Sequence, residues 1–141
     1  MVNATRIFIG AASAVLVAVG GMLAFAPQAL YHQAGGALAS DIVLSSDIRS
    51  GGTLLLACAG FLAFAALRAV HLGSALALTA LAFLGYGAGR LVSFVLDGQM
   101  NATLVAITGV EWAIGLAALV LAWRQSRGLR RPRPSMAARP A

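Results

Sequence analysis

Two ionisable residues, Arg90 and Glu111, stand inside stretches of this chain that are otherwise apolar. A charge in hydrocarbon is costly, so such a residue usually faces a protein interior or a wet cavity and has a partner. Arginine donates hydrogen bonds to carboxylates and phosphates, and glutamate can carry a proton. The two residues therefore indicate either an ion pair that fixes helix packing or a site for a ligand or a proton.

Composition places the surrounding chain in a membrane. Its 141 residues are 60% hydrophobic and only 10% charged, whereas an ordinary soluble domain has about 25% charged residues. Six of the ten arginines come after residue 123, so the net charge of +6 does not indicate a nucleic-acid-binding surface. The single cysteine, Cys58, excludes an intrachain disulfide. We expect no nucleic-acid partner, no metal and no cofactor.

Four apolar segments approach or exceed the length of about 20 residues that a helix needs to cross hydrocarbon. Only helices satisfy their own backbone in lipid, so the fold class should be all-α, an integral membrane four-helix bundle. We expect residues 1–124 to form this four-span domain and residues 125–141 to be a disordered basic tail that binds membrane lipids. The four expected spans are residues 7–25, 51–67, 72–96 and 103–123.

The first span has a second interpretation as a secretory signal. Arg6 precedes it, and Ala24-Phe25-Ala26 is similar to a cleavage site. Its length and the position of Pro27, just after that site, favour a retained helix.

Arginine placement predicts the orientation. With four spans, Arg6, Arg68 and the arginines of the tail fall on one side of the membrane, and Arg49 falls on the other. Because arginine and lysine accumulate in cytoplasmic segments, both termini of this multi-pass protein should be cytoplasmic. The long loop of about residues 28–48 should then be extracytoplasmic, with Ser46 or Asp47 as the N-cap of the second helix.

Residue spacing brings further polar side chains toward Arg90. Intervals of four, three and four residues place Tyr86, Arg90, Ser93 and Asp97 on one stripe of the third helix. From the helical rise, Arg90 and Glu111 lie roughly 10 Å and roughly 12 Å from the same membrane boundary, so an ion pair between them is expected.

Asp97 should lie where the helix dipole disfavours an anion, which calls for a nearby cation such as Arg49 or Arg90. We therefore expect one polar cluster that opens outward. Its candidate residues are Asp47, Arg49, Tyr86, Arg90, Ser93, Asp97 and Glu111.

Gly85 and Gly89 form a GxxxG pattern in the third span, which is typical of closely packed membrane helices. The pattern alone leaves two alternatives open. In the first, the glycines serve contacts within the bundle; in the second, they bind a second copy or another helix.

Two strings of residues resemble a known family. Ser46-Asp47-Ile48-Arg49-Ser50-Gly51-Gly52 opens the second span, and Gly89-Arg90-Leu91-Val92-Ser93 leads to Leu96-Asp97-Gly98 in the third. With Glu111 in the fourth span, this is similar to the small bacterial four-helix membrane proteins called domain of unknown function 4345. The resemblance covers roughly residues 7–124 and implies four helices in the inner membrane, with no assigned activity.

The leading hypothesis for function is a non-enzymatic role in binding or structure through the polar cluster. A small proton-coupled transporter that uses Glu111 as its titrating acid is one alternative, and a membrane enzyme acting on a lipid or small amphiphile is another. Flux, lipid turnover and stability measurements would discriminate among them.

The orientation is tested by a reporter that is active only in the periplasm. Fused at Ala141, it should be silent, because the arginine asymmetry places the C-terminus in the cytoplasm. An active reporter would show a reversed orientation.

Overall fold

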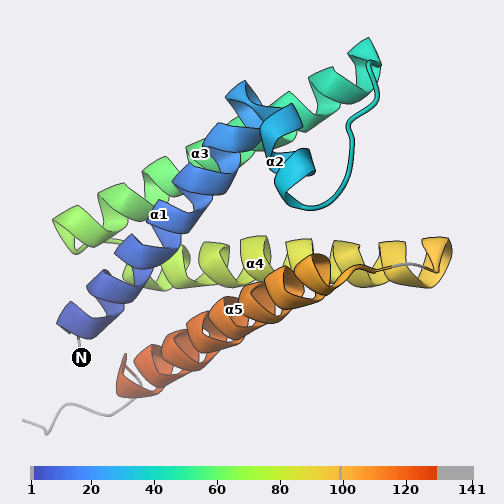
Figure 1. Ribbon diagram of the computed structural model, residues 1–141. Helices are drawn as coiled ribbons and strands as arrows, with labels where there is room; N and C mark the ends of the chain where they lie inside the picture. Colours follow the sequence, from blue (N-terminus) through green and yellow to red (C-terminus); the bar gives the residue numbers. More distant parts are fainter. Residues whose placement is uncertain (1, 99, 130–141) are drawn as a thin grey trace, which may run out of the picture.

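Helices make up almost all of the described chain. The structure is a computed structural model that describes residues 2–98 and 100–129. All helices except α2 are long and apolar enough to cross a membrane, which confirms the prediction of an all-α integral membrane fold with four spans. The helices run in the order α1 (Val2–Phe25), α2 (Pro27–Gln33), α3 (Ile42–Arg68), α4 (Leu72–Asp97) and α5 (Ala102–Leu129) (Figure 1).

Three helix boundaries differ by several residues from those expected, and the first is the start of α1, which begins at Val2 and not at residue 7. α3 begins at Ile42, well before residue 51, and its N-cap is Asp41, whose Oδ1 accepts a hydrogen bond from the Leu44 amide at 3.0 Å. The prediction that Ser46 or Asp47 is the N-cap was therefore wrong. Asp41 is an equally suitable N-cap, and apolar residues follow it directly. At the other end of the chain, α5 continues to residue 129, so residues 125–129 are helical. Residues 130–141, the rest of the expected tail, lie outside the described part.

α1 and α3 pack backbone against backbone through glycine. A Cβ added to Gly52 would lie 2.8 Å from the Gly20 carbonyl oxygen and 2.9 Å from the Leu23 carbonyl carbon, both on α1. Small residues permit this approach, which is the usual basis of helix association in lipid. Farther along the same interface, the Ser13 hydroxyl donates a hydrogen bond to the Ala59 carbonyl at 2.8 Å.

Two arginines secure the ends of the same helix pair. Arg6 of α1 donates from Nε to the Ala66 carbonyl at 2.7 Å, near the end of α3. Arg49 of α3 donates from Nη1 to the Ala24 carbonyl at 2.9 Å, at the end of α1. The last carbonyls of a helix lack intrahelical partners and carry partial negative charge, so each arginine caps the other helix.

α4 and α5 form a second pair, again through glycine. Gly87 of α4 lies against the indole of Trp112 on α5. A Cβ added to Gly115 of α5 would lie 2.7 Å from Cδ2 of Leu84. Each helix thus presents a glycine to a bulky side chain of the other helix.

The two pairs meet at one end of the molecule and diverge toward the other. We call the end where α1 begins and α5 finishes the terminal end, and the end that carries α2 the loop end (Figure 1). The main apolar core lies toward the terminal end. It includes Ile9, Ala12, Leu62, Ala65, Leu76, Ala80 and Ala118.

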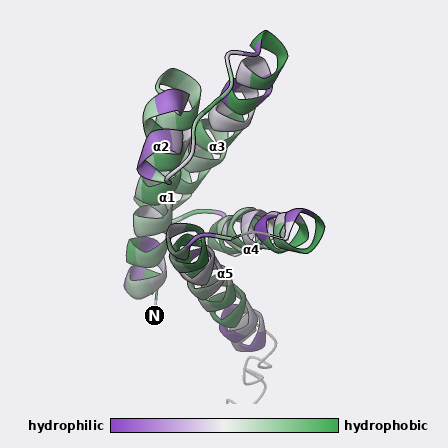
Figure 2. Cartoon of the chain, turned by 45° about the vertical axis from the view of Figure 1, so that its right-hand side comes forward, coloured by the Kyte–Doolittle hydropathy of each residue, from purple (hydrophilic) through white to green (hydrophobic). Residues whose placement is uncertain are grey.

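The distribution of hydrophilic residues follows the arrangement of the helices. In Figure 2, hydrophilic residues lie mainly on α2 and near the ends of the long helices, whereas their middle parts are mostly hydrophobic. The middle parts of the long helices can therefore face hydrocarbon. A charged residue within these parts is unusual and marks a candidate functional site.

The glycine contact between α1 and α3 can be tested with neighbouring substitutions. Gly52→Ala should destabilise the protein by about 1–3 kcal/mol, because the added methyl group collides with the backbone of α1. Gly51→Ala is the control, since no atom lies within 4 Å of a Cβ added there. The readout is the unfolding midpoint in detergent; equal effects of the two changes would contradict the proposed packing.

Candidate functional site

Arg90 and Glu111 form an ion pair between α4 and α5. Nε of Arg90 donates to Oε2 of Glu111 at 3.0 Å and to Oε1 at 3.2 Å. The side chains are 27% and 12% exposed, respectively. α4 and α5 are antiparallel, and helical side chains tilt toward the N-terminus of their own helix, so the two side chains lean toward each other. The predicted pair is confirmed.

A cavity of about 260 Å³ adjoins this pair. All four long helices contribute to its walls, so it lies between the α1–α3 pair and the α4–α5 pair. Its lining is almost wholly apolar apart from Tyr86 and Glu111. The apolar walls are formed by Val15, Leu16, Val19, Leu55, Ala82, Phe83, Ala106, Ile107 and Val110.

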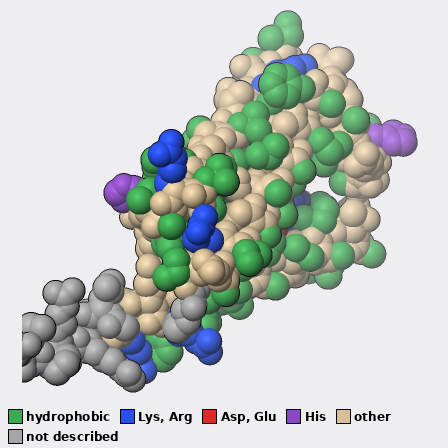
Figure 3. Space-filling model, turned by 90° about the vertical axis from the view of Figure 1, so that its left-hand side faces the viewer, with side chains coloured by type: hydrophobic (Ala, Val, Ile, Leu, Met, Phe, Trp, Pro, Cys, Tyr) green, Lys and Arg blue, Asp and Glu red, His purple; other side chains and the backbone are tan. Residues whose placement is uncertain are grey.

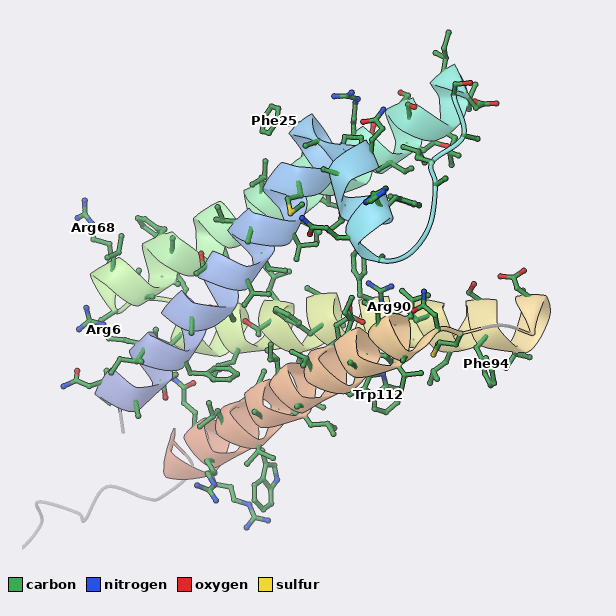
Figure 4. All side chains as sticks on the ribbon, in the orientation of Figure 1. Arg6, Phe25, Arg68, Arg90, Phe94 and Trp112 are labelled. Carbon is green, nitrogen blue, oxygen red and sulfur yellow. The ribbon has the colours of Figure 1, made fainter. Side chains whose placement is uncertain are left out.

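α2 packs against α1 and α3, at the loop end of the molecule (Figure 1). Tyr86 lies in the neighbourhood of Arg90 and Glu111 and of Tyr31 on α2. Figure 4 shows Arg90 on the side of α4 that faces α2. The segment after α2 is fastened to the start of α5, because the Asn101 Nδ2 donates to the Ala34 carbonyl at 2.8 Å. The site thus has an apolar body and a polar rim.

The remaining predicted residues do not join this group. The Ser93 hydroxyl donates to Oδ2 of Asp97 at 2.6 Å, which places both on the exposed end of α4. Arg49 caps α1, and Asp47 is exposed on α3. The prediction that these residues form a single charge network was therefore wrong. The two helix pairs diverge at the loop end, so α3 carries Asp47 and Arg49 away from α4.

Gly85 and Gly89 are exposed, and no atom lies within 4 Å of a Cβ added to either residue. Within the described chain, the close helix contacts use Gly87 and Gly115 instead. A role for Gly85 and Gly89 in binding a second copy or another helix stays a prediction.

Sequence reasoning missed two polar residues near the site. Asn101 was missed although an asparagine directly before an apolar segment is a common helix N-cap signal, and its Oδ1 does accept a hydrogen bond from the Leu104 amide at 2.8 Å. Tyr31 gave no such signal, because its proximity to Tyr86 depends on how α2 folds back. In the described ranges, no three His, Cys, Asp or Glu side chains are placed to share a metal ion.

Arginine gathers at the terminal end. Figure 4 labels Arg6 and Arg68 there, and Arg124 and Arg127 lie in the last turns of α5. Arg127 stacks over the Trp123 ring, 3.6 Å from its centroid. Figure 3, which faces this side of the molecule, shows several arginines on the surface. The cytoplasmic position of the terminal end stays a prediction.

The chain belongs to the family described as domain of unknown function (DUF4345), whose model matches residues 4–122. It is an integral membrane protein. The match covers every residue of the ion pair and the cavity. Comparisons with curated proteins and with solved structures gave no match.

The ion pair can be tested by a double-mutant cycle. Arg90→Ala and Glu111→Ala should each destabilise the protein by on the order of 3 kcal/mol, since each strands a partly buried charge. The double variant should cost clearly less than their sum, as measured by unfolding in detergent.

Asp97→Asn is the control, because the Asp97 carboxylate is exposed and has no ion-pair partner in the described residues. It should change stability by less than about 0.5 kcal/mol. Additive losses for Arg90 and Glu111 would contradict their interaction.

Proposed function

We propose that this protein binds an amphiphile in the cavity between its helix pairs, with the polar end of the ligand at Arg90 and Glu111. The observation that carries the proposal is the position of an intramembrane ion pair at the edge of an apolar cavity. Ligand sites are typically apolar pockets with a few polar groups that fix orientation.

The size of the cavity favours a slender ligand. At about 260 Å³, it is slightly smaller than the ~300 Å³ at which pockets for drug-sized molecules begin. It also opens toward the side, where the helix pairs diverge, so the surrounding lipid phase is its nearest source of ligand. Figure 3 shows the molecule hollowed between the part that carries α2 and the part formed by α4 and α5.

The lining favours binding over catalysis. Among the described residues that line the cavity, Glu111 and Tyr86 are the only polar ones, and neither is paired with a histidine, serine or cysteine nucleophile. In the proposed orientation, the loop end faces the outside of the cytoplasmic membrane, so the ligand would enter from the outer leaflet.

A small proton-coupled carrier is the second candidate. It is favoured by one observation, namely that the only acid in the described part of α5 lines the cavity. A carrier should give pH-dependent flux in sealed vesicles that Glu111→Gln abolishes. Binding without flux supports the first candidate.

Two alanines of α5 provide a matched test of the binding site. Both alanines are exposed, but only Ala106 lines the cavity. Ala106→Trp therefore fills the cavity, whereas Ala113→Trp adds the same side chain outside it. Each buried methylene contributes about 0.8 kcal/mol, so excluding only two of them from the cavity weakens binding about tenfold. Only Ala106→Trp should reduce retention of a photoreactive long-chain amphiphile in nanodiscs. Equal retention by both variants would overturn the proposed site.

A further inference from the structure

The Arg90 guanidinium has unused hydrogen-bonding capacity. Both of its contacts with Glu111 come from Nε, and neither Nη1 nor Nη2 has an acceptor within the described part of the chain. Arginine carries five N–H donors, so the four N–H groups on these two nitrogens remain available. In a medium without water, a charged donor left without an acceptor is unfavourable, and an anionic or strongly polar acceptor would satisfy it.

Arg6 and Arg49 have an acceptor that Arg90 lacks, namely the backbone at the end of a neighbouring helix. Arg6 and Arg49 each reach the free carbonyls of a neighbouring helix end, where the backbone supplies acceptors. Arg90 lies beside the interior of α5, whose carbonyls are used within the helix. Its only acceptor in the described chain is therefore a carboxylate that Nε already occupies.

From this arrangement we infer that the ligand of the cavity is a single-chain anionic amphiphile, such as a long-chain fatty acid. Its carboxylate accepts hydrogen bonds from Nη1 and Nη2 of Arg90, and its chain occupies the apolar body of the cavity. This inference rests on the proposed binding function and adds the chemical class of the ligand.

Charge complementarity and size support this occupant. A charge-assisted pair between guanidinium and carboxylate is about twice as strong as a neutral hydrogen bond, and its planar geometry permits two parallel contacts. Tyr86 lines the same cavity, and a tyrosine hydroxyl can donate a hydrogen bond. The narrow cavity admits one chain more readily than two.

In this arrangement, the Glu111 carboxylate competes with the carboxylate of the ligand for Arg90. It neutralises Arg90 when the cavity is empty and opposes a second anion at the same place. Removing this charge should therefore strengthen binding of the anion, which is opposite to the effect expected if Glu111 only stabilised the fold or carried a proton.

The test compares three ligands with one chain length on the full-length wild-type protein in zwitterionic nanodiscs. Hexadecanoate, its methyl ester and hexadecylamine each compete with a photoreactive fatty acid for labelling. We expect hexadecanoate to compete roughly tenfold better than the ester, and the amine to compete least. This comparison needs no variant, so a folding defect cannot obscure it.

Variants then assign the preference to the ion pair. Glu111→Gln keeps an acceptor for Nε but removes the charge, so it should bind hexadecanoate more tightly than the wild type does. Hexadecanoate should also raise the unfolding midpoint of Glu111→Gln more than that of the wild type, because ligand binding to the folded state stabilises it. Arg90→Gln should abolish the preference of the carboxylate over the ester.

The possible results separate the inference from the proposed function. Equal competition by all three ligands, lost in Ala106→Trp, would overturn the anionic ligand and leave amphiphile binding in place. No competition by any ligand would overturn both. Displacement of the label by excess acetate or inorganic phosphate would show a site for small soluble anions and would also overturn this inference.

Discussion

Close contact at glycine is the constraint on which the rest of this structure depends. In lipid, helices gain little by exchanging lipid contacts for apolar side chains, so their association requires tight packing or polar contacts. Gly20 and Gly52 allow this within the α1–α3 pair, and Gly87 and Gly115 allow it within the α4–α5 pair. The strong contacts are therefore made within the pairs. The contacts between the pairs are confined mostly to the terminal end, where the apolar core lies.

The separation of the pairs accounts for the polar site. Because the pairs diverge, the space between them at the loop end is not filled by side chains and remains as the apolar cavity. Arg90 and Glu111 lie on the pair that forms one side of this space, so they neutralise each other while staying accessible from it. Arg6 and Arg49 illustrate the other way to accommodate an arginine, since each caps a helix end and is thereby committed to structure. This contrast distinguishes Arg90, whose partner lies within the bundle and which keeps hydrogen-bonding capacity for a ligand beside the cavity.

Features of the fold that depend on local sequence were predictable. Length and hydropathy determine the four spans, and α4 matches its prediction to within one residue. The start of α3 was predicted less accurately, because Asp41, Ser46 and Asp47 are all suitable N-caps. Only the structure shows which of the three caps the helix, and it is Asp41. The Arg90–Glu111 pair was also predictable, since adjacent antiparallel helices with a short connection place matching depths side by side.

The sequence by itself thus determined the membrane environment, the four spans, and the pairing of the two charges that hydrocarbon would otherwise leave unsatisfied. Only the tertiary structure decided that Asp47 and Arg49 lie apart from this pair, and that Tyr31 lies near it. It also decided that a cavity exists. The physical reason is that helical periodicity specifies which face a residue occupies, whereas the angle between helix pairs arises from side-chain packing among residues far apart in the chain.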